Sequence, residues 1–204
     1  MIPNSSCRFL SNGYRFELKE QNYITISPCC RWQGPMSWLG QSQAEIKKWR
    51  DQFSQSNSYL LESCRGCNQL NSEMRDSSYK SISELEEFGN SSFLEIQLTR
   101  TCNAACIICG PNFSTLWQQE LRKQNTIPII NTDSTNTVQE ILSLIDLEQV
   151  RTINFLGGET FLTEEDTQIL SQLGNPELVK VKYATNGSIY PSSKRMDLWK
   201  RLKR

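Results

Sequence analysis

The sequence predicts an α/β protein, because segments with the pattern of strands alternate with helical segments through its second half. Three short segments have the apolar pattern of strands, at residues 93–98, 151–156 and 178–184. A segment with helical spacing of apolar residues follows each of them. This alternation favours a parallel sheet, in which ligands bind at the carboxyl ends of the strands.

The first of these strands leads into a loop that contains three cysteines. Residues 93–98 alternate between polar and apolar side chains, which predicts a strand with one buried face. Cys102, Cys106 and Cys109 follow in the spacing C-x3-C-x2-C. A cubane [4Fe-4S] cluster needs one thiolate per iron, so three thiolates leave one iron free to bind another molecule.

The helices of this half are predicted from apolar spacing and from proline. Pro111 is expected to open a helix whose apolar residues include Leu116, Trp117 and Leu121. Residues 125–136 form a connection, and apolar residues at 138–145 predict a second helix. Further helices are predicted at 164–173 and from residue 192 onward.

The region up to residue 90 has few long periodic segments. Alternating residues predict a hairpin over 14–18 and 23–27. A helix is expected from Ser42 to about Phe53, with Ser42 and Glu45 as a capping box. A short helix at 81–88 ends in a Gly-Asn-Ser-Ser run, which is the predicted boundary between a domain at 1–90 and a domain at 91–204.

Five cysteines in this region predict a second metal site. Cys64 and Cys67 form a C-x2-C pair, and Cys7 precedes the hairpin. Cys29 and Cys30 follow the hairpin. Because adjacent residues on a strand point to opposite faces, only one of the two is expected to face a metal, and Cys29 is favoured. Four thiolates suit zinc and iron-sulfur clusters alike, so both remain open.

Composition and charge exclude several functions. The 22 basic and 22 acidic residues give no electrostatic reason to expect a nucleic-acid or membrane partner. No apolar run approaches the length of a membrane span, so the expected location is the cytoplasm. Thiols there stay reduced, so eight cysteines indicate metal or redox chemistry. With no histidine, proton transfer would fall to Glu, Asp, Lys, Tyr or Cys.

The cysteine triplet after a first strand resembles the signature of the radical S-adenosylmethionine (SAM) superfamily. The resemblance implies a [4Fe-4S] cluster on Cys102, Cys106 and Cys109, whose open iron binds the amino and carboxylate groups of SAM. It also implies a (β/α)6 barrel, of which this chain holds the N-terminal half. The family often has an aromatic residue before the last cysteine, and here Ile108 is expected to pack beside the cluster.

Two further motifs strengthen this resemblance. Gly157, Gly158 and Glu159 follow the second strand and resemble the GGE motif, whose backbone accepts hydrogen bonds from the amino group of SAM. Thr160 stands where the family has proline. Asn186 lies in a Thr-Asn-Gly turn that is similar to the turn at the mouth of the family's active site. The cofactor-binding residues implied are therefore Gly157, Gly158, Glu159 and Asn186.

The N-terminal cysteines resemble those of the twitch domain, the shorter relative of the SPASM domain. The resemblance implies a small α+β domain that carries an auxiliary [4Fe-4S] cluster, here placed before the barrel. The matching residues are Cys7, the Pro-Cys-Cys at 28–30, and the pair Cys64 and Cys67. A zinc site with the same ligands is the alternative.

The activity implied is that of an oxidoreductase with radical chemistry. A donor such as flavodoxin or ferredoxin would reduce the cluster, and cleavage of SAM would give a 5′-deoxyadenosyl radical that removes hydrogen from a substrate. A peptide or protein substrate, or a small molecule undergoing dehydrogenation, fits an auxiliary cluster. The alternatives are a non-catalytic metal-binding module and an electron carrier. Since three of six strand-helix units are present, the chain is expected to be a fragment or a truncated product.

Overall fold

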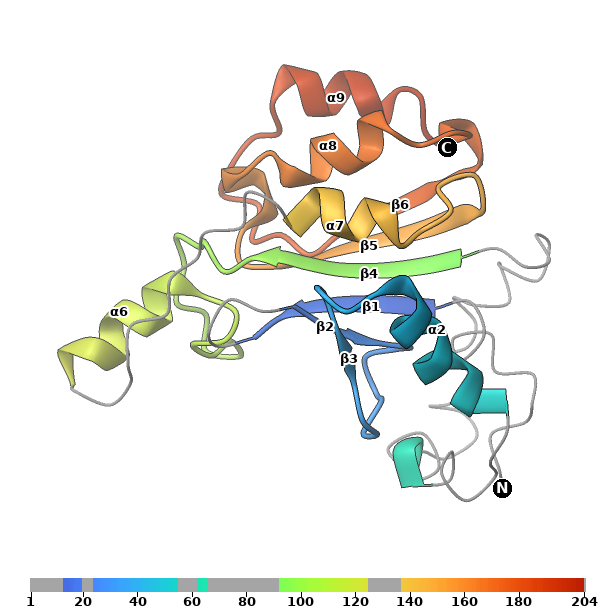
Figure 1. The fold of residues 1–204 in the computed structure, drawn as a ribbon. Coiled ribbons are helices and arrows are strands. Elements are labelled where there is room, and N and C mark those ends of the chain that lie inside the picture. Colours follow the sequence, from blue (N-terminus) through green and yellow to red (C-terminus); the bar gives the residue numbers. More distant parts are fainter. Residues whose placement is uncertain (1–12, 20–23, 55–61, 66–91, 125–136, 204) are drawn as a thin grey trace.

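A single six-stranded sheet forms the centre of the computed structural model, which describes residues 13–19, 24–54, 62–65, 92–124 and 137–203 (Figure 1). The strands are β1 (Gly13–Leu18), β2 (Ile24–Ser27), β3 (Ser37–Trp38), β4 (Ser92–Thr99), β5 (Val150–Gly157) and β6 (Lys180–Tyr183). Their order is β3-β2-β1-β4-β5-β6. β1, β4, β5 and β6 are parallel, whereas β2 and β3 run antiparallel to their neighbours. The mixed α/β class is confirmed.

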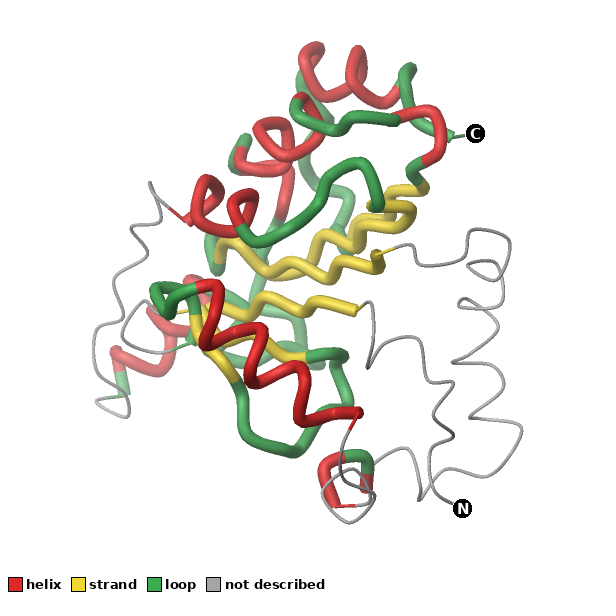
Figure 2. Tube along the Cα trace, turned by 45° about the vertical axis from the view of Figure 1, so that its right-hand side comes forward, coloured by secondary structure: helices red, strands yellow, loops and turns green. Residues whose placement is uncertain are grey.

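The described helices gather mainly on one face of this sheet. They are α2 (Gln43–Asp51), α6 (Thr115–Lys123), α7 (Thr137–Ser143), α8 (Glu165–Ser171) and α9 (Ser193–Trp199), with short 3-10 turns at Gln52–Ser54, Thr160–Leu162 and Pro176–Leu178. Figures 1 and 2 show α2, α7, α8 and α9 over the sheet, and α6 apart from them beyond the strand ends. The helices therefore form one layer, and α6 belongs to the loop region.

One hydrophobic core lies between this helical layer and the sheet. Alternate strand residues face it, and the fully buried ones include Phe16, Leu94, Ile96, Ile153 and Phe155. The helices contribute Ile46 and Trp49 from α2, Ile141 from α7, and Ile169 and Leu170 from α8. Burying each such side chain stabilises the fold by roughly 1.5–3 kcal/mol.

The face of the sheet opposite the helical layer is polar. The prediction that β4 is buried on one face only is wrong. Glu95 is 8% exposed and Gln97 is 2% exposed, so this strand is buried on both faces. Arg15 of the neighbouring strand β1 forms an ion pair with Glu95, and Gln97 donates to the carbonyl oxygen of Asn112. These partners come from distant segments, which explains why alternation alone predicts an exposed face.

Several predicted helix boundaries are confirmed and others are wrong. Ser42 caps α2, and Ser42 and Glu45 form the predicted capping box. The helix expected to open at Pro111 starts instead at Thr115, because Ser114 is the N-cap and accepts from Trp117 N. β3 was not predicted. β6 begins two residues later than predicted, because a 3-10 turn occupies Pro176–Leu178.

The predicted hairpin is confirmed as an antiparallel pair of β1 and β2, although its turn lies outside the described residues. The helix predicted at 81–88 and the connection at 125–136 also lie outside them. So does the predicted domain boundary, and that division stays a prediction. Strands from both sides of it share the sheet through the parallel pair of β1 and β4. Among the described helices, none has the length and apolar character needed to span a membrane.

A buried ion pair fixes α9 against α8 and β6. Arg195 is fully buried, Asp166 is 1% exposed, and Arg195 Nε and Nη2 donate to the carboxylate of Asp166 at 2.8 and 2.7 Å. Tyr183 donates its hydroxyl hydrogen to Asp166 Oδ2 at 2.8 Å and accepts from Trp199 Nε1 at 3.0 Å. Burial and the charge of Asp166 raise the pKa of Tyr183 far above its usual value. The phenol therefore stays protonated and holds the end of β6 in place.

Candidate metal centre

The cysteine loop and the Gly-Gly turn meet at one edge of the sheet. β4 ends at Thr99 and β5 ends at Gly157, and these two residues are partners in the parallel pairing of the strands. Gly158 N donates to Thr99 O at 3.0 Å, and Glu159 N donates to Thr101 O at 2.8 Å. Two backbone hydrogen bonds thus join the turn to the segment that leads into the cysteines.

The start of α6 holds the cysteine loop in shape. Cys102 N donates to Thr115 Oγ1 at 3.1 Å, and Ser114 Oγ donates to Ala104 O at 2.8 Å. Trp117 Nε1 donates to Cys106 O at 2.8 Å. The loop is therefore fixed at both its first and second cysteine, although the cysteines themselves lie near the surface.

Arg100 anchors the base of the loop. Its side chain is 1% exposed, Nε donates to Asn112 O at 3.0 Å, and Nη2 donates to Leu18 O at 2.7 Å. A guanidinium is well suited to this task because its donors are arranged in a rigid plane. Arg100 joins the end of β1, the end of β4 and the segment before α6.

The three thiols lie close enough to influence one another. Partial desolvation raises the pKa of the Cys109 thiol, and the charges of Cys106 and Cys102 raise that pKa further. Cys102 is half-buried, while Cys106 and Cys109 are exposed, with Cys109 N donating to Cys106 O at 2.9 Å in a turn. Neighbouring thiolates repel one another, so a bound cation would stabilise their charged form.

In the described part of the chain, no three Cys, Asp or Glu side chains are placed to hold a single metal ion. In a cubane each thiolate binds a different iron, so the sulfur atoms need not converge on one point. Ile107 and Ile108 between the cysteines are 95% and 92% exposed. Neither isoleucine packs into the protein core, and the packing of Ile108 beside a cluster stays a prediction.

The two glycines are required by the close approach of the cysteine loop. Gly157 has a φ of 128°, and a Cβ there would lie 2.4 Å from Thr99 O. A Cβ on Gly158 would lie 2.1 Å from Thr101 O. The space that a side chain would need at either glycine is therefore already filled by the backbone of residues 99–101.

Glu159 is a buried anchor, with its carboxylate turned into the protein. The side chain is fully buried and accepts hydrogen bonds from Phe161 N at 3.1 Å, Thr185 Oγ1 at 2.8 Å and Asn186 N at 2.7 Å. The carboxylate thus ties the turn after β5 to the turn after β6. Its role in this structure is to position these two turns.

Asn186 connects the third turn to the cysteines. Its Nδ2 donates to Asn103 Oδ1 at 3.0 Å and lies 4.0 Å from Cys102 Sγ. Asn103 in turn donates to Ser188 Oγ at 2.8 Å. The structure therefore brings together Cys102, Cys106, Cys109, Gly157, Gly158, Glu159 and Asn186 from three strand ends.

The residues around this centre offer groups that suit a cluster and an amino-group ligand. Three thiols from one loop are soft ligands of the kind that hold iron-sulfur clusters. Gln97 Oε1 on β4 is buried and has no hydrogen-bond partner within the described residues. A buried acceptor of this kind is available to a donor on a ligand. These features fit a cluster with a bound ligand.

The N-terminal cysteines are only partly described. Cys7 and Cys67 lie outside the described residues. Cys30 is exposed, Cys29 is half-buried against the core, and Cys64 is 7% exposed within it. β2 ends at Ser27, so Cys29 and Cys30 lie in the turn after it, where the alternation of a strand does not decide their direction. The second metal site stays a prediction.

Five residues that shape the centre had no predicted role there: Arg100, Ser114, Thr115, Trp117 and Thr185. Ser114 had a recognisable signal, since a serine two residues before the apolar pair Leu116 and Trp117 is a typical N-cap. Arg100 had none, because its acceptors are backbone carbonyls distant in sequence. Comparisons with protein-family models, curated proteins and solved structures found no match to this chain.

Proposed function

We propose that this chain is a radical SAM enzyme with its cluster on Cys102, Cys106 and Cys109. The observation that carries the proposal is the pair of backbone hydrogen bonds between the cysteine loop and the Gly-Gly-Glu turn. Three thiols and a glycine turn at the ends of adjacent parallel strands form a place where a cluster and its ligand can lie side by side.

Each group at the centre has a separate task in this proposal. The three thiolates hold the cluster, and the backbone at Gly157 and Gly158 accepts from the amino group of SAM. Glu159 holds the Thr-Asn-Gly turn so that Asn186 stays beside Cys102. When bound by Cys102, Cys106 and Cys109, the cluster would supply one electron for reductive cleavage of SAM to methionine and a 5′-deoxyadenosyl radical, which would take hydrogen from a substrate.

The partners follow from this chemistry. A one-electron donor of the flavodoxin or ferredoxin type would approach the loop where Cys106 and Cys109 are exposed. The substrate class in this proposal is a peptide or protein, and the N-terminal cysteines hold an auxiliary [4Fe-4S] cluster or zinc. An electron carrier without SAM chemistry is the second candidate, because exposed cluster ligands also suit direct electron exchange.

Metal analysis and a SAM cleavage assay test the proposal together. Protein reconstituted anaerobically should contain about four irons and four sulfides for one cubane, or about eight irons for two. After reduction it should convert SAM to 5′-deoxyadenosine. The triple variant with alanine at Cys102, Cys106 and Cys109 should lose about four irons and this activity, while Cys30→Ser should keep both.

The results separate the candidates. Bound iron without 5′-deoxyadenosine would favour the electron carrier. Zinc without iron would leave a structural metal site and contradict the radical reaction.

A further inference from the structure

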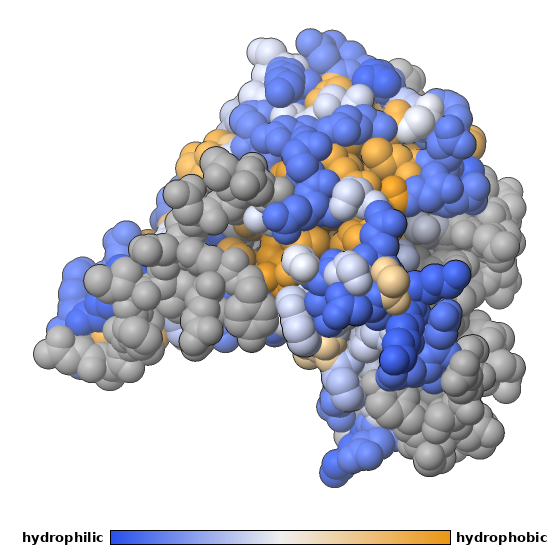
Figure 3. All heavy atoms as spheres, viewed as in Figure 1, coloured by the Kyte–Doolittle hydropathy of each residue, from blue (hydrophilic) through white to orange (hydrophobic). Residues whose placement is uncertain are grey.

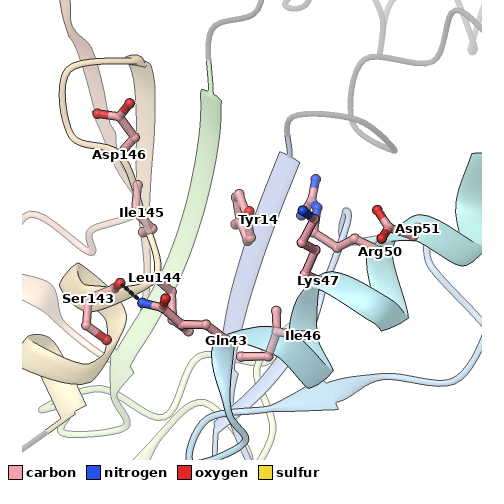
Figure 4. A pocket seen from close by; sticks show the side chains of 10 residues that line it. All are labelled: Tyr14, Gln43, Ile46, Lys47, Arg50, Asp51, Ser143, Leu144, Ile145 and Asp146. Atoms are coloured by element: carbon pink, nitrogen blue, oxygen red, sulfur yellow. Dashed lines mark hydrogen bonds between the residues drawn. The ribbon is translucent and has the colours of Figure 1, made fainter.

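An open crevice of about 520 Å³ lies between α2 and the turn that follows α7 (Figure 4). Tyr14 near the start of β1 lines it, as do residues 143–146 before β5. These segments are at the amino ends of the parallel strands, whereas the cysteine loop is at their carboxyl ends. The crevice is therefore separate from the candidate metal centre.

One stripe of α2 forms the first wall of the crevice. Gln43, Ile46, Lys47 and Arg50 all line it, in the spacing that places residues on one side of a helix. Gln43 Nε2 donates to Ser143 O at 2.8 Å and joins this wall to the opposite one. The two walls are thus held together by a direct contact, which gives the crevice a defined width.

Part of the lining of the crevice is apolar and aromatic. Ile46, Leu144 and Ile145 line it together with the ring of Tyr14. The guanidinium of Arg50 lies 4.0 Å from the centre of that ring, and its Nη1 donates to Gly13 O at 2.9 Å. In Figure 3 apolar surface, in orange, shows between hydrophilic patches in the middle of this face. A ligand would find both apolar contacts and polar groups in the crevice.

The α2 wall of the crevice carries two cations and one carboxylate, and the opposite wall carries one carboxylate. Lys47 and Arg50 lie on the α2 side, and Asp146 lies on the side of the turn, with Tyr14 between them (Figure 4). Asp51 is also on the α2 side and lies beyond Arg50 as seen from Tyr14. Asp146 Oδ1 accepts from Glu148 N at 3.1 Å, which fixes the carboxylate on its turn. A matching ligand carries a negative group at one end and a positive group at the other.

We propose that this crevice binds a small zwitterion of dipeptide length with an apolar centre. The charged side chains lie on either side of the Tyr14 ring (Figure 4), whereas the ammonium and carboxylate of an α-amino acid share one carbon, which favours a longer ligand. A dipeptide spans roughly 7 Å between its termini. A volume of about 520 Å³ lies in the range of small-molecule sites, about 300–1,000 Å³. The carboxylate faces Lys47 and Arg50, and the ammonium faces Asp146.

Titrations with L-leucyl-L-leucine, followed by NMR chemical shifts of the full chain, test this proposal. A ligand of this size should bind with a Kd on the order of 0.1–1 mM. N-acetyl-leucyl-leucine and leucyl-leucine amide each lack one charge and should bind roughly 3- to 10-fold more weakly. Leucine alone should bind more weakly than all three. Absence of binding by the dipeptide at 10-fold above the upper end of this range would overturn the proposal.

Two charge variants connect the affinity to the named residues. Asp146→Asn should weaken binding of the dipeptide but leave the N-acetylated form unchanged, since that form has no ammonium to lose. Lys47→Met should weaken binding of the dipeptide but leave the amide unchanged. Lys48→Met on the same helix does not line the crevice and serves as the control. Circular dichroism checks that each variant folds, and equal losses in Lys47→Met and Lys48→Met would refute the assigned site.

Discussion

Adding one methyl group at Gly158 should disrupt the junction of the cysteine loop and the Gly-Gly-Glu turn. A Cβ there would lie 2.1 Å from Thr101 O and 2.7 Å from the carbonyl carbons of Arg100 and Thr101. Contacts below 3.0 Å are essentially never seen for a real Cβ, so one backbone segment must move by roughly 1 Å. These are backbone atoms, which a rotation of a side chain cannot relieve.

The expected cost of Gly158→Ala is about 1–3 kcal/mol in the free energy of unfolding. For a chain of this size each kcal/mol lowers Tm by about 2–4 °C, so a decrease of roughly 2–12 °C is expected. Thermal and urea unfolding measure this change. Because the segment that moves leads directly to Cys102, iron bound after anaerobic reconstitution should decrease as well.

Gly110→Ala is the matched control for this change. Gly110 directly follows Cys109, and a Cβ there meets no atom within 4 Å. Alanine makes the unfolded chain less flexible than glycine does. Gly110→Ala should therefore leave the free energy of unfolding unchanged or raise it by up to about 1 kcal/mol. If Gly158→Ala unfolds at the same temperature as Gly110→Ala and binds the same amount of iron, the proposed junction is wrong.

Three further substitutions test other contacts of the fold. Arg195→Met leaves the buried carboxylate of Asp166 without its cation and should cost about 3–5 kcal/mol in urea unfolding, whereas a loss below 1 kcal/mol would contradict the anchoring of α9. Ser114→Ala removes the N-cap of α6 and should cost about 0.5–2 kcal/mol, with Ser114→Thr retaining most of the stability. Burial tends to raise the pKa of Glu17, but the hydrogen bond from Lys19 and the charge of Arg15 lower it overall. Glu17 therefore stabilises the fold above its unfolded pKa near 4.5 and loses this contribution as pH falls through the lower folded value. Glu17→Gln should be less stable than the native chain at pH 7 and should match it in acid; a difference that persists in acid would exclude this cause.

Local chemistry explains which parts of the fold were predictable. The strand at 93–98 and the helix after Ser42 depend on neighbouring residues, through apolar spacing and a capping box, and both are present in the structure. The burial of Glu95 and Gln97 depends on Arg15 and on Asn112, which are far away in sequence, and a periodic pattern contains no information about such partners.

At the candidate centre, too, some features follow from local pattern and others depend on residues far away in sequence. Parallel pairing predicts that the loops after β4 and β5 meet, and they do. Glu159 was expected to bind a cofactor as part of the Gly-Gly-Glu motif, and this stays a prediction; its side-chain carboxylate, for which no role was predicted, is fully buried and accepts from the turn after β6. The hydrogen bonds of the Glu159 carboxylate depend on the lengths of the turns after β5 and β6 and on Thr185. The sequence pattern alone therefore did not predict them.

The most direct test of a cluster with one open iron is electron paramagnetic resonance of the reduced, anaerobically reconstituted protein before and after adding SAM. If Cys102, Cys106 and Cys109 hold a cubane with a free coordination site, the spectrum should change on addition of SAM, and the change should be absent in the variant with alanine at all three positions. A cluster signal that SAM leaves unaltered, or one that persists in the triple variant, would contradict the proposed function.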